Sequence, residues 1–271
     1  MVDQTAVLND FTLVVGVDAK TLPQLAVTLP TWYEHKRPLF QRPIIVFYDR
    51  TQLSLGQVEN VRRYMPHAQL VGWPHVGVTY AETGGKWGNA QRAKMLAGFT
   101  YIPSEYVRTE YWLKLDTDVI ATGQDYWIDS SWLASKAAII APPWSYTKPP
   151  TQMDELDAWV EKYPRSIFAG TKPLALHPQP GATKLFHRRI CSWCAFFRTE
   201  LTRQMAYTAQ RSLGLGQCPV PSQDGFSYYV ATRLGLPILR QPMKDRGWAL
   251  VNHRTLGRMA GIANDKHGCP L

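Results

Sequence analysis

The sequence predicts an α/β protein whose central, mostly parallel sheet is flanked by helices. Short β-branched apolar runs alternate with segments of helical period from the first strand onward, which is typical of a parallel sheet. Several of these runs are followed at once by carboxylates, at Asp18, Asp49 and Asp116. Ligands of open α/β sheets bind beyond the carboxyl ends of the strands. We therefore expect the functional site at that edge of the sheet.

The N-terminal half, about residues 1–121, is expected to alternate strands with helices. Thr21 is the expected N-cap of the first helix, and Pro30 is expected to kink or divide that helix. The expected strands are residues 11–17, 43–48, 68–72 and 111–121, and the expected helices are residues 21–36, 53–64 and 89–99.

The second half, about residues 122–271, is expected to complete one domain of 271 residues. Its residues 142–189 are rich in proline and aromatic residues, which indicates an irregular lobe over the cleft or a variable surface insertion. Gly235 is the expected helix stop in this half. The expected helices are residues 130–136, 152–163, 199–210 and 222–235, and the expected strands are residues 137–141, 192–197, 237–240 and 247–253.

The composition limits the classes of ligand that we expect the protein to bind. The net charge of +9 favours an anionic ligand, and its dispersed distribution fits a pyrophosphate-containing small molecule better than nucleic acid. The N-terminus lacks a leader pattern, and no apolar run is long enough to span a membrane, so we expect a cytoplasmic protein with no transmembrane segment. Cys191 and Cys194 lie in an apolar strand-like run and are expected to be buried thiols rather than a metal site.

The segment Asp116-Thr117-Asp118 interrupts the apolar run of residues 111–121. Two buried carboxylates need a partner, and a hard divalent cation with oxygen ligands supplies one. The alternative is a strand that ends in a polar turn, with both carboxylates solvated or capping the next element.

Other candidate site residues each allow a structural interpretation beside the functional one. Lys86 and Arg92, near a glycine-rich turn that leads into a helix, suit an anion site or a solvated basic helix face. Asp18 and Asp49 are candidate ligand contacts or turn residues. Asp224 falls in the first turn of its helix, where carboxylates are common.

In this order, these pieces resemble the nucleotide-sugar-dependent glycosyltransferases of the GT-A fold that carry an Asp-x-Asp motif. The resemblance covers roughly residues 10–255. It implies that Asp118 binds Mn²⁺ or Mg²⁺ directly, that Asp116 lies on the metal or the ribose, and that His253 is the third protein ligand, with His267 as the alternative. The ion would bridge the diphosphate of the donor.

The resemblance also implies that Asp18 and Asp49 lie near the base and ribose, and that Lys86 or Arg92 neutralises the departing nucleotide. Asp224 matches the acidic residue that faces the acceptor and acts as general base in inverting members, although the family's Glu-Asp pair is Gln223-Asp224 here. The expected reaction is sugar transfer from a UDP- or GDP-sugar to a glycan, protein or small-molecule acceptor, with inversion favoured over retention.

Two alternatives stand beside this hypothesis. A nucleotidyltransferase acting on a sugar phosphate would also use carboxylate-bound Mg²⁺, but it should carry a glycine-rich signature after the first strand, where residues 18–23 read Asp-Ala-Lys-Thr-Leu-Pro. A non-catalytic basic module for nucleic acid or polysaccharide would tolerate loss of Asp116 and Asp118 and would bind with a steep salt dependence.

Overall fold

The computed structural model describes residues 11–19, 21–73, 89–121, 130–141, 143–145, 157–158, 160–161, 168, 170–171, 188–190, 194–208 and 223–240. For residues 89–97, 130, 143–145, 188–190, 207–208, 223–225 and 240 it describes the backbone alone.

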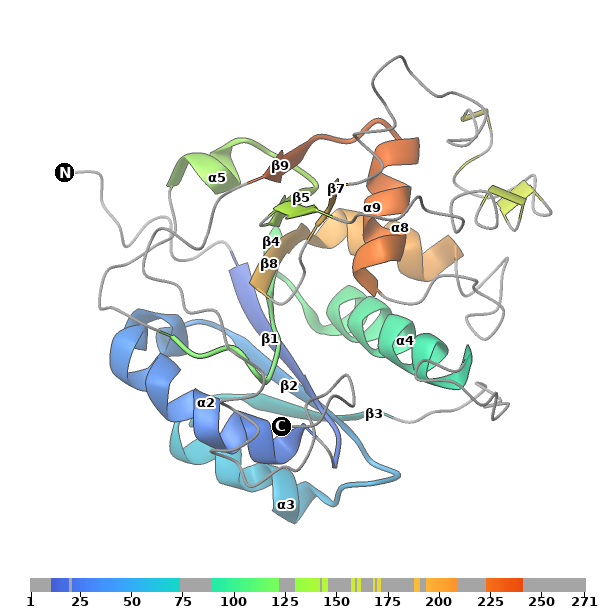
Figure 1. Ribbon diagram of the computed structural model, residues 1–271. Coiled ribbons are helices and arrows are strands. Elements are labelled where there is room, and N and C mark those ends of the chain that lie inside the picture. The colour runs from blue at the N-terminus through green and yellow to red at the C-terminus, as the bar shows by residue number, and fades with distance from the viewer. Residues whose placement is uncertain are drawn as a thin grey trace.

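A seven-stranded sheet runs through the molecule in the order β3-β2-β1-β4-β8-β5-β9 (Figure 1). Within this sheet β8 is antiparallel to both of its neighbours, and the other pairs are parallel. A mostly parallel α/β sheet is therefore confirmed. The strands are β1 (Phe11–Val17), β2 (Ile44–Asp49), β3 (Gln69–Trp73), β4 (Tyr111–Leu115), β5 (Ile139–Ala141), β8 (Cys194–Arg198) and β9 (Ile238–Arg240), and a separate antiparallel pair is formed by β6 (Pro143–Ser145) and β7 (Arg188–Ile190).

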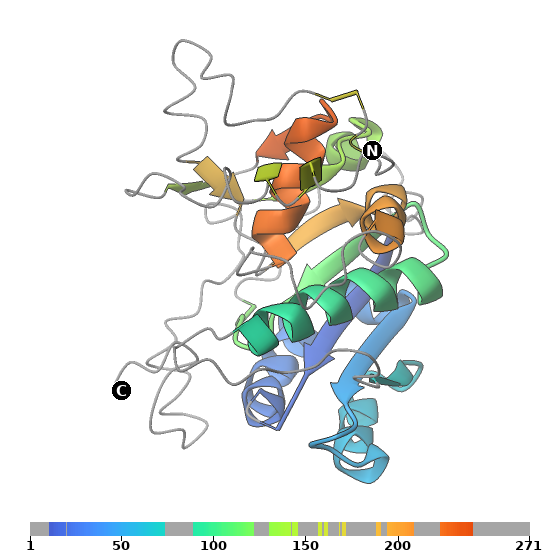
Figure 2. The ribbon, with the colours of Figure 1, turned by 90° about the vertical axis from the view of Figure 1, so that its right-hand side faces the viewer.

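Helices cover both faces of this sheet, so that the described part of the chain has three layers (Figure 1). Figure 2 looks onto one of these faces, where a helix lies across the strands. One face packs against α2 (Leu22–His35), α3 (Leu55–Glu59), the 3₁₀ turns η1 (Arg37–Gln41) and η2 (Asn60–Arg63), and α5 (Ser130–Ala134). The other face packs against α4 (Asn89–Tyr106), α8 (Thr199–Thr208) and α9 (Gln223–Arg233). None of the described helices is both long and apolar enough to cross a membrane.

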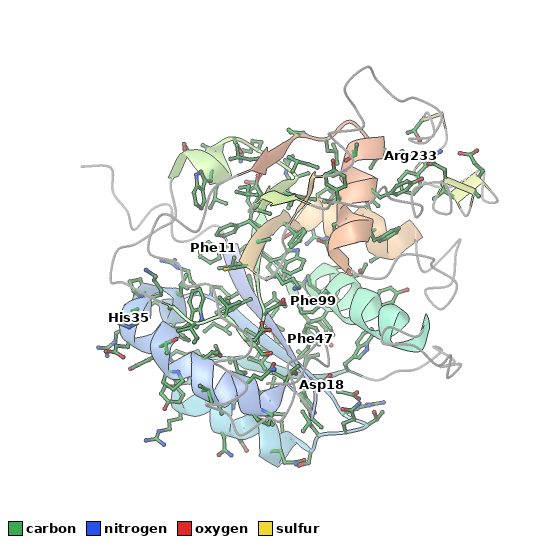
Figure 3. The ribbon with its side chains drawn as sticks, in the orientation of Figure 1. Phe11, Asp18, His35, Phe47, Phe99 and Arg233 are labelled. Atoms are coloured by element: carbon green, nitrogen blue, oxygen red, sulfur yellow. The ribbon has the colours of Figure 1, made fainter. Side chains whose placement is uncertain are left out.

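Phe47 of β2 fixes how closely α4 approaches the sheet. Its ring meets Phe99 edge-on, with centroids 5.0 Å apart (Figure 3). A Cβ added to Gly16 of β1 would lie 2.4 Å from this ring, and one added to Gly98 of α4 would lie 2.7 Å from it. Both glycines are therefore needed for the ring to fit between helix and sheet.

The end of α9 confirms Gly235 as the helix stop. Gly235 has φ +67°, and its N–H donates to the carbonyl of Thr232 at 3.1 Å. The N–H of Leu236 donates to the carbonyl of Ala231 at 2.8 Å, which completes a Schellman motif. The chain thus turns directly from α9 into β9.

Several boundaries differ from the sequence predictions. The helix predicted over residues 53–64 divides into α3 and η2, with a capping box between Ser54 and Gln57 at its start. Pro30 neither ends nor divides α2, because Leu29 and Trp32 on either side of it remain buried in the same core. Similarly, α4 continues beyond the predicted end at residue 99, since Ile102 extends its buried face.

The strand predicted over residues 111–121 stops at Leu115, and the rest of that segment is a turn. Cys194 is buried in β8, as expected, whereas Cys191 lies outside the described residues. Of the helix predicted over residues 152–163, residues 157–158 and 160–161 are described and helical. The strand predicted over residues 247–253 lies outside the described residues.

Candidate functional site

Four of the predicted site carboxylates stand at one edge of the sheet. Adjacent parallel strands pair Val15 with Leu115 and Val17 with Tyr48, so β1, β2 and β4 end side by side. Asp18, marked in Figure 3, follows β1 directly, and Asp49 is the last residue of β2. Asp116 and Asp118 follow β4. The structure therefore brings these residues to the carboxyl edge where the sequence predicted a site.

The turn after β4 is held against α2 by side-chain hydrogen bonds. Asp116 opens the turn, with its carbonyl accepting from the N–H of Val119 at 3.3 Å. α2 donates two of these bonds, from Thr28 Oγ1 to the carbonyl of Thr117 (2.8 Å) and from Trp32 Nε1 to the carbonyl of Val119 (2.6 Å). The turn donates the other two, from Thr117 Oγ1 to Gln24 Oε1 (3.1 Å) and from the N–H of Ala121 to Thr31 Oγ1 (3.0 Å). Because α2 satisfies these polar groups, the backbone can leave the sheet while Val119 and Ala121 stay buried.

Sequence reasoning did not identify this role of α2, although a signal was present. Gln24, Thr28 and Thr31 recur at helical spacing, and so mark a polar stripe on a helix that also buries Leu25 and Leu29. Gln24 and Thr28 are only 3% and 1% exposed. Buried polar side chains need hydrogen-bond partners, and here Gln24, Thr28 and Thr31 find them both within α2 and in the turn after β4.

Sequence reasoning also did not identify Lys114, the penultimate residue of β4, as a contact of the turn after β4. Its side chain is 4% exposed, and its ammonium forms an ion pair with Asp116 Oδ1. The same ammonium lies 4.6 Å from the centre of the Phe99 ring, on the face of the sheet covered by α4. A lysine between Leu113 and Leu115 in an apolar strand is a sequence signal, because a buried ammonium needs a counter-charge.

The two carboxylates of the Asp-x-Asp segment have different surroundings. The side chain of Asp116 is 22% exposed and in contact with Lys114, whereas Asp118 is 1% exposed. Their oxygens are the ligand type that Mg²⁺ and Mn²⁺ prefer, so the donor set fits a hard divalent cation. Within the described residues there is no cluster of three or more histidine, cysteine or acidic side chains, and the predicted ligands His253 and His267 lie outside that part of the chain.

Asp18 and Asp49 each organise a turn. Asp18 Oδ1 accepts from the backbone N–H and the hydroxyl of Thr21, both at 2.8 Å. Asp49 Oδ1 accepts from the N–H of Thr51 at 3.0 Å and from its hydroxyl at 2.6 Å. Thr21 precedes α2 as expected, but its side chain bonds to Asp18 and makes no cap bond to the helix. These contacts show a local structural role for both carboxylates, and their contact with a nucleotide stays a prediction.

The remaining predicted residues are placed only in part. Asp224 lies in the first turn of α9, and Arg92 lies near the start of α4, where the backbone alone is described. Lys86 lies outside the described residues. The structure thus places the amino ends of α4 and α9 but leaves the side-chain roles as predictions.

A buried network around Arg233 joins the proline- and aromatic-rich segment to α9. Arg233 Nη1 donates to Asp157 Oδ1 at 2.7 Å and to the hydroxyl of Tyr229 at 2.6 Å, and Tyr229 in turn donates to Asp157 Oδ1 at 2.6 Å. Arg233 Nε donates to Thr171 Oγ1 at 2.8 Å, and the guanidinium lies 5.3 Å from the centre of the Phe168 ring. Burial, followed by the hydrogen bond to Asp157, raises the pKa of Tyr229 well above its ordinary value. The helix that begins near Asp224 is therefore tied to the proline- and aromatic-rich segment.

Comparison with known proteins relates this architecture to solved structures. No protein-family model matches the sequence, and a search of curated proteins finds no match. Core-mannan synthase A from Aspergillus fumigatus, in its Mn/GDP form, superposes with a TM-score of 0.56 at 12% identity, over 88% of this chain and 72% of that one. The mannosyltransferase Ktr4p from S. cerevisiae, in complex with GDP, gives a TM-score of 0.52 at 11% identity, over 88% and 69%. At these identities the likeness is one of fold, and it confirms the GT-A-like architecture predicted from the sequence.

Proposed function

We propose that this chain is a metal-dependent glycosyltransferase that moves a sugar from a UDP- or GDP-sugar to an acceptor. The observation that carries the proposal is the Asp116–Asp118 turn, which α2 holds at the carboxyl edge of a GT-A-like sheet. Two proteins of similar fold are mannosyltransferases or mannan synthases whose structures hold GDP, one of them with Mn. The GDP in both structures favours GDP as the first nucleotide to test.

The metal would be held by oxygen ligands of the turn. Asp118 and Asp116 are the proposed carboxylate ligands, with His253 as the third group and His267 as its alternative. When bound, the cation would neutralise the negative charge that develops on the departing nucleoside diphosphate. The hydrogen bonds from α2 hold the turn in one conformation, so binding of the cation requires little further ordering of its backbone.

The other proposed roles follow a division of the chain into a nucleotide-sugar-binding half, about residues 1–121, and an acceptor-binding half, about residues 122–271, which includes residues 142–189. Asp18 and Asp49 would lie beside the base and ribose, and Lys86 and Arg92 would contact the phosphates. Asp224 would remove the proton from the acceptor hydroxyl, which corresponds to an inverting reaction. The Arg233 network supports this division, since it ties the acceptor segment to the helix that carries Asp224.

A thermal-shift panel of GDP, UDP, ADP and CDP, each with and without Mn²⁺, tests the donor site. One nucleotide should raise the melting temperature more with Mn²⁺ than without it, because a ligand that binds only the folded state stabilises it. Asp118→Asn should abolish the metal-dependent part of the shift, whereas Glu200→Gln, an exposed carboxylate on α8, should leave it intact. Absence of any Mn²⁺-dependent shift in the unaltered protein would remove the main support for a glycosyltransferase.

A second experiment tests the proposed general base. Asp224→Asn should lower the rate of sugar transfer by a factor of about 10² to 10⁴ while leaving nucleotide binding unchanged. The anomeric configuration of the product, read by NMR, distinguishes inversion from retention. Transfer at the original rate by Asp224→Asn would exclude this residue as the base.

Two further measurements, with nucleoside triphosphates and with increasing salt, discriminate the alternatives. A nucleotidyltransferase should respond to nucleoside triphosphates and release pyrophosphate. A non-catalytic basic module should be insensitive to Asp118→Asn and should lose its ligand steeply as salt rises.

A further inference from the structure

Arg233, the last residue of α9, holds four residues of the proline- and aromatic-rich insertion, residues 142–189. Its guanidinium donates from Nη1 to Asp157 Oδ1 at 2.7 Å and from Nε to Thr171 Oγ1 at 2.8 Å, and its Nη2 pairs with Glu161. It also lies 5.3 Å from the centre of the Phe168 ring. Each of its three nitrogens thus binds a different residue of the insertion. Because the side chain is 2% exposed, water competes little for these bonds.

Tyr229 extends these contacts by one turn of α9. It lies four residues before Arg233, and its hydroxyl accepts from Arg233 Nη1 and donates to Asp157 Oδ1, both at 2.6 Å. Its ring meets that of Phe168 edge-on, with centroids 5.7 Å apart. Among the described residues, the side chains of Arg233 and Tyr229 bond to the insertion and to each other, and to no residue of the nucleotide-sugar-binding half. Movement of the insertion without α9 would therefore break the hydrogen bonds of a buried guanidinium.

Arg233 lies at the far end of α9 from Asp224. The two residues are nine positions apart, or about 14 Å along the helix axis. The turn after α9 leads directly to Ile238, which stands level with Trp112 near the start of β4 through the pairing of the intervening strands. Arg233 is therefore on the amino side of the sheet, and Figure 3 shows it far from Asp18 at the carboxyl edge. It does not reach the proposed reacting groups and can influence them only through α9.

We propose that Arg233 is a positioning residue for the acceptor. It holds the insertion against α9, so that the acceptor-binding surface and Asp224 keep one fixed relation to each other. This inference rests on the proposed function, in which the insertion belongs to the acceptor-binding half and Asp224 is the general base. Loss of the guanidinium then impairs transfer to a sugar hydroxyl, which must be oriented, far more than hydrolysis by water, which needs no such surface.

Hydrogen exchange followed by mass spectrometry tests whether Arg233 holds the two segments together. Arg233→Lys keeps a positive charge beside Asp157, but a single ammonium cannot reproduce the fork of the guanidinium. We expect exchange to become at least about tenfold faster in peptides from residues 157–171 and from α9, and to stay unchanged in peptides from β1 and β2. Thr202→Val removes a buried 2.8 Å hydrogen bond from Trp112 on the neighbouring helix α8 and serves as the control for a general loss of stability.

Transfer and hydrolysis, measured separately, give a readout that a purely structural role would not move. GDP-mannose is incubated with Mn²⁺, with and without methyl α-mannoside as the acceptor, and both GDP release and the glycoside product are quantified. For Arg233→Lys we expect the KM for the acceptor to rise by at least about tenfold. Hydrolysis without acceptor and the affinity for GDP should stay within about twofold of the original. Thr202→Val should leave the KM for the acceptor unchanged.

Several outcomes would overturn the inference while the proposed function stands. These are unchanged exchange in residues 157–171, faster exchange of equal size in β1 and β2, and loss of transfer in parallel with hydrolysis and GDP affinity. If Arg233→Lys fails to fold, Tyr229→Phe, which removes one hydroxyl of the same network, must show the same local pattern at a smaller size. If methyl α-mannoside is not glycosylated by the unaltered protein, the exchange comparison decides. Absence of any Mn²⁺-dependent binding of GDP or UDP would overturn the proposed function, and the acceptor role of Arg233 with it.

Discussion

Replacing Arg233 by methionine should destabilise the fold strongly. The side chain of Arg233 is 2% exposed and that of Asp157 is 8% exposed, so the substitution leaves a buried carboxylate without its counter-charge. Breaking a buried ion pair in this way costs about 3–5 kcal/mol. For a chain of this size, each kcal/mol lowers the melting temperature by roughly 2–4 °C, so the expected fall is about 6–20 °C. Thermal and urea unfolding followed by circular dichroism measure this loss.

The same network contains its own control. Glu161 also pairs with Arg233, but its side chain is 57% exposed, so Glu161→Gln should cost less than about 1 kcal/mol. Adding Asp157→Leu to Arg233→Met removes the uncompensated carboxylate and should recover a large part of the stability. The reasoning is wrong if Arg233→Met costs no more than Glu161→Gln, or if the double variant is no more stable than Arg233→Met.

Three further predictions concern packing, the turn and pH. Thr28→Val should cost about 1–3 kcal/mol in urea unfolding and reduce the Mn²⁺-dependent thermal shift, because it removes a 2.8 Å hydrogen bond to a carbonyl of the turn; an unchanged shift would show that the turn holds its shape without α2. Gly16→Ala should cost about 1–3 kcal/mol in the free energy of unfolding, because the added methyl group would clash with Phe47. Gly56→Ala, whose methyl group would meet nothing within 4 Å, should be neutral or stabilise by up to about 1 kcal/mol. Equal effects of the two substitutions would contradict the packing argument. Burial and, after it, the nearby carboxylate of Glu110 raise the pKa of Tyr111 from 10.0 to about 12. The stability that the protonated Tyr111 contributes should therefore be complete below pH 10 and be lost as the pH rises through about 12. Tyr111→Phe should remove this dependence from the pH profile of unfolding.

Local pattern was sufficient for most of the fold because its strands are buried runs of residues that favour β-structure. Phe11–Val17 and Ile44–Asp49 are buried along nearly their whole length, and such runs have few alternatives. The pattern failed after Leu115, since Val119 and Ala121 are apolar and buried in a turn as fully as they would be in a strand. An apolar run therefore does not distinguish a strand from a turn that another element satisfies.

The composition of the site was only partly predictable. Asp116 and Asp118 could be singled out as candidates because carboxylates stand out in an apolar segment. The side chains that hold the turn lie 87 to 93 residues earlier in the chain, and no local pattern connects Thr28 or Trp32 with it. The partner of Lys114 is only two residues away, but the burial that makes this pair important depends on Phe99 of another element.

The reversed direction of β8 determines where the proline- and aromatic-rich insertion joins the sheet. β5 runs parallel to β4 and ends at Ala141, whereas β8 runs against both strands and begins at Cys194, opposite Leu115. The insertion between them therefore leaves and re-enters the sheet on two neighbouring strands, at the same edge as Asp116. Such a segment can be exchanged or lengthened without altering the order of the strands. Under the proposed function, replacing this one insertion would change acceptor specificity while the proposed nucleotide-binding half is kept.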